Sequence, residues 1–411
     1  MRIHWSKSGA TIGFFFLVLL LLYLAILPYG DEPDFTYQVP YYILFLDSLN
    51  LSYFSDGISS ISNCKYLHNP YHLFGMYDYD SCLMSAELIV KRALFTFILY
   101  IPLLLISIFY FKGSNSTRKT IFKGYSFSNK SIQLSLLFPS FVYYASLFSK
   151  EQVTLMLSVL VVFAVFRARY LLSIILLMIL ASIDKGNAIV VVLIFTYIFI
   201  SIFIYRIFGY RACLIVSILS VAVAYYFSTD LLYLFKPLSL KVSEVLINVE
   251  QNFVNDKYPL WLRPVLTFMS FNFMTPALSK HPLLYLLTAS FLAYILFKIK
   301  YNKKTLKVDK EYLIVSLAVV TMILIIVFIL PGYNNAKYYI FTLPIFFNTI
   351  LQYVSFNRIV IFCIISNSIV IIDYSFFYII GCSGCNPYHH GNSVINFFKD
   401  MTINYFTGEI Y

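Results

Sequence analysis

The sequence predicts an all-helical polytopic membrane protein, and its composition and the placement of its charges predict that class. Hydrophobic residues fill 60% of the 411 positions and charged residues only 12%, about half the share of charged residues in a soluble protein. Apolar runs near bilayer length recur, which gives about eleven transmembrane helices. Basic residues gather in the short segments between runs, as the positive-inside rule requires. The distribution of the net charge of +11 is therefore typical of a protein in a lipid bilayer and does not indicate binding to nucleic acid.

The first run, Ala10–Pro28, follows Arg2 and Lys7. Its apolar core is longer than that of a signal peptide, and no small-x-small cleavage site follows before Tyr29. We interpret residues 1–28 as an uncleaved signal-anchor helix with a cytoplasmic N-terminus.

Further spans follow in order along the chain. They are Ala93–Phe111, Ile132–Leu147, Val153–Phe166, Tyr170–Ile183, Ala188–Tyr205, Ala212–Phe227, Leu283–Phe297, Leu313–Leu330, Tyr338–Phe356 and Ile359–Ile380. With the N-terminus inside, the basic segments 112–131, 167–169, 206–211, 298–312 and 357–358 all fall on the cytoplasmic side. The predicted units are the outer loop 29–92, the helix module 93–227, the outer loop 228–282, the C-terminal helices 283–380 and an outer tail, 381–411.

An acidic motif follows the first span. Asp31, Glu32 and Asp34 lie within four residues. Carboxylates crowded at a membrane surface repel one another, which raises the pKa of at least one of them. Such a carboxylate suits a general base that takes a proton from a sugar hydroxyl. Pro33 favours an extended backbone here, and Asp31 is nearest the membrane. We therefore expect Asp31 to be the base, with Glu32 as the alternative and Asp34 as a structural partner.

Several cations lie at the outer boundary, where the positive-inside bias disfavours them. They are Lys150, Lys185, Lys337 and Arg263, and Tyr338 follows Lys337. A lipid phosphate in the outer leaflet is a natural partner for them, since charge-assisted bonds to phosphate are strong. The alternative is that Lys150 and Lys185 snorkel and pair with Glu151 and Asp184 beside them, and that Arg263 is an interfacial anchor. Lys337 has no acidic neighbour in the sequence.

Cys64 and Cys82 share the first outer loop. An oxidising compartment permits a disulfide between them, which would close the loop over the membrane. Cys382 and Cys385 precede a pair of histidines in the tail, where a disulfide is favoured over a metal. No cofactor is expected, and a divalent metal is not favoured.

The architecture resembles the GT-C glycosyltransferase superfamily. The likeness rests on the acidic motif after the first span, the long first outer loop, the polar turns between helix pairs and the basic-aromatic start of a late span. It implies a polyprenyl-phosphate sugar donor, a glycan acceptor and transfer on the periplasmic face of the bacterial inner membrane. The resemblance puts the catalytic acid at Asp31 or Glu32 and a second acidic site at Glu151. Length and outer tail are similar to those of the phage-type serotype-converting glucosyltransferases, which modify O-antigen in lipopolysaccharide.

Two other functions stay open. An O-antigen or capsule polymerase also has about a dozen spans and large outer loops, but it typically relies on arginines, and the second large loop offers Arg263 alone. A lipid-linked oligosaccharide flippase would need polar residues along a path through the membrane. The predicted spans are nearly free of charge, so transport ranks third.

Overall fold

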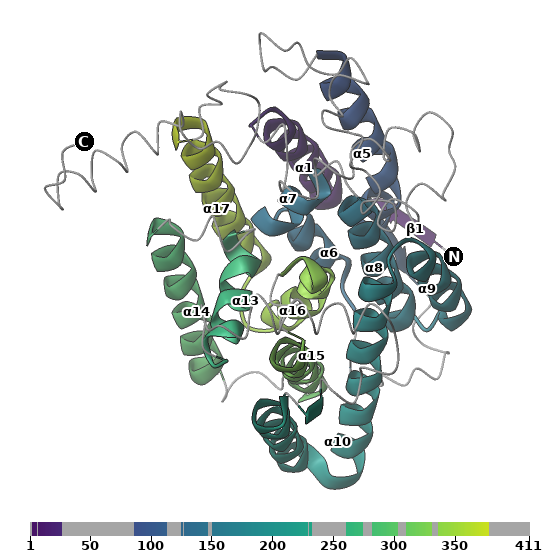
Figure 1. Ribbon diagram of the computed structural model, residues 1–411. Coiled ribbons are helices and arrows are strands. Elements are labelled where there is room, and N and C mark those ends of the chain that lie inside the picture. Colours follow the sequence, from purple (N-terminus) through teal and green to yellow (C-terminus); the bar gives the residue numbers. More distant parts are fainter. Residues whose placement is uncertain are drawn as a thin grey trace, which may run out of the picture.

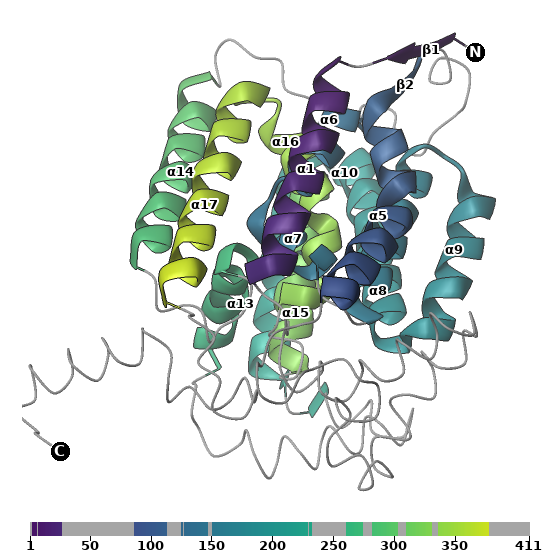
Figure 2. The same cartoon turned by 90° about the horizontal axis from the view of Figure 1, so that it is seen from above.

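Many of the helices run side by side in a bundle, seen from two directions in Figures 1 and 2. The structure is a computed structural model that describes residues 2–5, 7–26, 86–112, 125, 127–146, 150–228, 230–231, 260–273, 282–302, 310–330 and 336–377. Its α-helices are α1 (Lys7–Ile26), α5 (Ala86–Ile108), α6 (Asn129–Leu136), α7 (Pro139–Ser146), α8 (Lys150–Phe166), α9 (Tyr170–Ile183), α10 (Lys185–Tyr226), α13 (Leu262–Phe273), α14 (Pro282–Asn302), α15 (Lys310–Ile329), α16 (Leu343–Ile350) and α17 (Phe356–Phe377). The helical fold class is confirmed for the described residues, apart from one ribbon of two strands.

Two helices in the described ranges, α10 and α15, are long and apolar enough to cross a membrane. Shorter apolar helices lie at other predicted spans, and α9 begins and ends at the residues expected from the sequence, Tyr170 and Ile183. Membrane-capable helices are therefore present. The total number of spans stays a prediction.

Helix α10 is a hairpin of two antiparallel arms. Its backbone leaves the helical region at Gly209, where φ is 81° and ψ is −178°. Tyr197 on the first arm donates a hydrogen bond to Ser220 Oγ on the second, at 3.3 Å. In a straight helix, residues 23 positions apart would be separated by about 34 Å. The turn seen in Figure 1 thus confirms that a break within the basic segment 206–211 separates the two predicted apolar runs.

We expect Gly209→Ala to destabilise the protein by about 1–3 kcal/mol, because this combination of φ and ψ is essentially restricted to glycine. A Cβ added at Gly209 would meet no atom within 4 Å, so the cost is conformational and not a clash. Thermal unfolding in detergent measures the effect. Gly13→Ala is the matched control, because its Cβ would make only an ordinary contact, 3.6 Å from Leu104 Cδ2. Equal melting temperatures for the two variants would contradict the strained turn.

The centre of the bundle contains a broken helix. The sequence predicts one span over Ile132–Leu147, but α6 ends at Leu136 and α7 begins at Pro139, so this prediction of a single helix is wrong. Pro139 has no N–H group to continue the helical ladder. Asn367 on α17 donates to the carbonyl of Leu137 at 2.7 Å, and Tyr23 on α1 donates to Asn367 at 2.9 Å. The break is sustained because other helices satisfy its backbone.

A second irregular segment packs on the first. The predicted span Tyr338–Phe356 consists of two 3₁₀ turns, η5 (Ala336–Tyr338) and η6 (Ile340–Thr342), followed by the short helix α16. Asn348 of α16 accepts a hydrogen bond from the backbone N–H of Ser128 at 3.0 Å. The prediction of one continuous helix is therefore wrong here too, because hydropathy alone does not distinguish a continuous span from a folded segment.

The N-terminus forms a ribbon that the sequence did not predict. Strand β1 (Arg2–Trp5) pairs antiparallel with β2 (Phe109–Lys112). The predicted span Ala93–Phe111 therefore ends in a strand, and its helix starts earlier, at Ala86. Behind the ribbon, α1 approaches α5 so closely that a Cβ on Gly9 would clash with the backbone of Ser107 and Ile108. Small residues allow such close helix contacts.

Basic residues from several predicted cytoplasmic segments meet at one end of the bundle. Arg206 pairs with Glu311 at 3.5 Å, and Arg167 donates to Asn129 at 2.9 Å. The ring of Tyr125 packs between those of Phe166 and Tyr312, with both centroid distances 4.7 Å, and so joins the two groups. These cations therefore share one end of the fold, which we call the basic end.

Candidate functional site

A partly buried ion pair lies at the opposite end of α8. Lys337 Nζ lies 3.4 Å from Glu151 Oε1, and the two side chains are 17% and 8% exposed. Glu151 is in the first turn of α8, where the helix dipole favours a negative charge. Glu151 precedes Phe166, which packs at the basic end, by 15 positions on that helix. The ion pair therefore lies about 22 Å from the basic end. Lys337, in η5, also lies 5.6 Å from the ring centroid of Tyr338.

Lys337 has no acidic neighbour in the sequence, but the fold brings to it a carboxylate from 186 residues away. The sequence predicts that Lys150 and Glu151 lie between two spans, but both belong to the first turn of α8. Glu151 therefore pairs with the distant lysine, in a site that no local pattern reveals.

Gln152 fixes the start of α8. Its side chain is fully buried, and Nε2 donates to Thr96 Oγ1 and to the carbonyl of Ala145, both at 2.5 Å. Tyr100 on α5 donates to the carbonyl of Gln152 at 3.0 Å. These bonds tie α5, α7 and α8 together directly beside Glu151. Sequence reasoning missed Thr96 and Tyr100, and a polar residue inside an apolar run was the only signal for Thr96.

Helix α13 forms a wall beside the ion pair. The ring of Phe271 stacks on that of Tyr339, with centroids 6.5 Å apart, so α13 packs against the residues that follow Lys337. Near the other end of α13, Arg263 Nη1 donates to the carbonyl of Phe328 at 3.4 Å. Burial lowers the pKa of the Arg263 guanidinium from its ordinary value. The predicted outer loop 228–282 thus contains a helix that places Arg263 at the end of α15.

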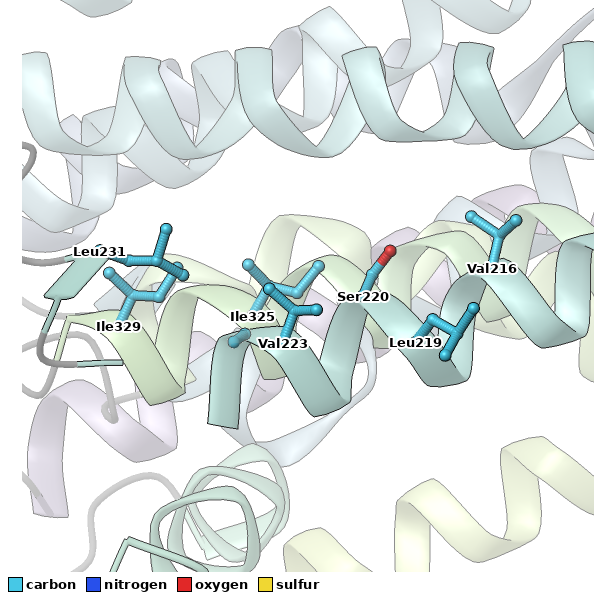
Figure 3. A pocket seen from close by; sticks show the side chains of 8 residues that line it. Val216, Leu219, Ser220, Val223, Leu231, Ile325 and Ile329 are labelled. Atoms are coloured by element: carbon cyan, nitrogen blue, oxygen red, sulfur yellow. The ribbon is translucent and has the colours of Figure 1, made fainter. Parts of the chain in front are cut away.

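An apolar groove begins close to Arg263. It has a volume of about 380 Å³ and lies between the second arm of α10 and α15 (Figure 3). Its lining residues are Val216, Leu219, Ser220, Val223, Ala224, Leu231, Ile325 and Ile329. Ile329 follows Phe328, whose carbonyl accepts the hydrogen bond from Arg263. A guanidinium therefore lies near one end of a groove that suits a hydrocarbon chain.

The other predicted site residues either have a structural role or lie outside the described residues. Asp184 caps α10, accepting from the backbone N–H of Asn187 at 3.1 Å and from its side-chain amide at 3.0 Å. This cap is a structural role, and Lys185 beside it is exposed. Asp31, Glu32, Asp34, Cys64 and Cys82 lie outside the described residues, so the acidic motif and the disulfide stay predictions.

The described residues therefore offer cations and a buried carboxylate, without a group of three His, Cys, Asp or Glu side chains placed to hold a metal ion. An ammonium has three donors and can bind a carboxylate and a phosphate together. Arg263 lies on α13, which packs beside the ion pair. This end of the bundle therefore has the chemistry to hold an anionic head group whose chain lies in an apolar groove.

Comparison of the chain with models of protein families, with curated proteins and with solved structures finds no match.

Proposed function

We propose that the chain is an integral membrane glycosyltransferase that moves a sugar from a polyprenyl-phosphate donor to a cell-surface glycan. The observation that carries the proposal is the partly buried Lys337–Glu151 pair at the end of the bundle, with Arg263 on α13 and the apolar groove between α10 and α15. A polyprenyl phosphate has both matching parts, an anionic head and a long apolar chain. In this proposal Lys337 and Arg263 hold the phosphate, and the groove holds part of the chain.

The acidic motif supplies the base in this proposal. The chain between α1 and α5, which contains Asp31 and Glu32, enters α5 at Ala86. Ten positions later, Thr96 of α5 bonds Gln152 at the start of α8. Asp31 takes the proton of an acceptor hydroxyl, whose oxygen forms a bond to the anomeric carbon as the bond from that carbon to the phosphate oxygen breaks. The electron pair stays on the phosphate, which needs no general acid, and the anomeric configuration inverts.

The membrane placement belongs to the same proposal. About eleven spans with a cytoplasmic N-terminus and a periplasmic C-terminus would put the basic end inside and the ion-pair end outside. Chemistry at the outer end has no access to cytoplasmic nucleotide sugars, which favours a donor delivered by the bacterial inner membrane itself.

A polysaccharide polymerase is the second candidate, and one observation favours it. Arg263 lies in α13, and Lys337 lies in η5, which packs against α13. Separated cations suit a pyrophosphate, which carries more negative charge than the single phosphate of the first candidate. A polymerase would take its growing glycan from such a pyrophosphate-linked lipid.

Deletion of the gene from its native host tests both candidates. A transferase that decorates a glycan predicts the loss of one sugar mass from every repeat unit, with unchanged chain length, in mass spectra of the surface glycan. A polymerase predicts a collapse of chain length with unchanged repeats. An unaltered glycan would rule out both. Reconstituted protein supplied with polyprenyl-phosphate glucose tests the donor directly, since neither a polymerase nor a flippase consumes it.

A further inference from the structure

Two cations converge on one tyrosine at the basic end of the bundle. Arg358 on α17 donates a hydrogen bond to the hydroxyl of Tyr294 on α14, and its guanidinium carbon lies 5.9 Å from the ring centroid. Lys298 Nζ lies 5.8 Å from the same centroid. The two helices are held together by the stacked rings of Phe291 and Phe362, whose centroids are 3.9 Å apart. The arrangement is therefore set by packing between the helices.

This cluster has an excess of positive charge. The ion pairs found in the described ranges join Arg206 to Glu311 and Lys337 to Glu151, and neither includes Lys298 or Arg358. Both cations lie within about 6 Å of one neutral ring, at the distance typical of cation–π contacts. Two like charges held beside the same ring repel each other, and an anion bound to both would lower that cost.

The surroundings indicate what kind of anion. Leu296 and Phe297, directly before Lys298, are 66% and 61% exposed. Lys298 lies four positions before the end of α14, and Arg358 lies two positions after the start of α17. The cations thus stand where an apolar surface meets the ends of the helices. A ligand at this boundary would contact hydrocarbon on one side and cations on the other, which a free phosphate ion would not.

We propose that Lys298, Arg358 and Tyr294 bind the head group of an anionic phospholipid. The guanidinium and ammonium would bind its phosphate oxygens. A phenol that accepts one hydrogen bond still has its own proton to donate, so Tyr294 would add a third contact. The inference rests on the membrane placement proposed above, which puts this end at the anionic cytoplasmic leaflet, and not on the transferase chemistry.

Native mass spectrometry of the full chain, purified in detergent and titrated with phosphatidylglycerol or phosphatidylcholine, tests the site. We expect a preference for phosphatidylglycerol that falls about fivefold in Arg358→Gln or Lys298→Gln and about twenty-five-fold in the double variant. Lys310→Gln is the matched control, since Lys310 is an exposed cation at the start of α15, and it should keep the wild-type preference. If the double variant does not fold, the preference for phosphatidylglycerol in the two single variants tests the proposal.

Two results would overturn the proposal. One is a folded Arg358→Gln variant that retains the wild-type preference for phosphatidylglycerol. The other is displacement of the bound phospholipid by millimolar inorganic phosphate, which would make a soluble anion the ligand. Loss of the preference with normal glycan transfer would support the lipid site and leave the transferase proposal to its own test.

Discussion

Replacing Lys337 with methionine is expected to lower the free energy of unfolding by about 3–5 kcal/mol, because it leaves the charge of Glu151 buried without its ammonium partner. Glu151 is only 8% exposed and Lys337 17%, so solvent screens this pair far less than a surface salt bridge. The residues also join two segments 186 positions apart, and the loss should therefore loosen η5 from α8. Thermal and denaturant unfolding in detergent micelles measure the change.

A double-mutant cycle separates the pair from its surroundings. Glu151→Gln with Lys337→Met removes both charges and should recover part of the stability lost in either single variant, with a coupling energy of about 0.5–3 kcal/mol. Lys185→Met is the control, since Lys185 is an exposed cation at the start of α10, and it should change stability by no more than about 0.5 kcal/mol. If Lys337→Met unfolds like this control, the ion pair does not stabilise the fold.

Asp31→Asn is expected to reduce glycan transfer by about 10²–10⁴-fold, the usual cost of losing a general base. The amide keeps the size of the side chain but does not accept the proton of the attacking hydroxyl. Initial rates with polyprenyl-phosphate glucose in proteoliposomes, at equal protein abundance, measure the loss.

Glu32→Gln and Asp34→Asn accompany this variant as isosteric controls. Asp34→Asn should cost far less, because a loop contact does not enter the chemical step. A large loss confined to Glu32→Gln would move the base to the alternative residue. If all three variants transfer sugar at nearly the wild-type rate, the acidic motif is not the catalytic centre.

The sequence by itself determined the helical class and the approximate position of most helices. Apolar runs of near-bilayer length have few ways to satisfy their backbone other than a helix, and this explains why α9 matches its predicted bounds, Tyr170 and Ile183. The basic segment that contains Gly209 likewise separates two apolar runs, and the chain turns there. These features depend on local composition, which the sequence displays directly.

The tertiary structure alone decided which polar residues meet. Lys337 finds Glu151, and Gln152 finds Thr96, through the packing of α5, α7, α8 and η5. Hydropathy also did not distinguish continuous helices from the broken segments α6–α7 and η5–η6–α16, since the stability of each break depends on partners elsewhere. Asn367, which bonds the carbonyl of Leu137, lies 230 positions away in the chain. Pairings at such separations are set by how the helices pack, because a buried polar group must find its partner wherever the fold supplies one.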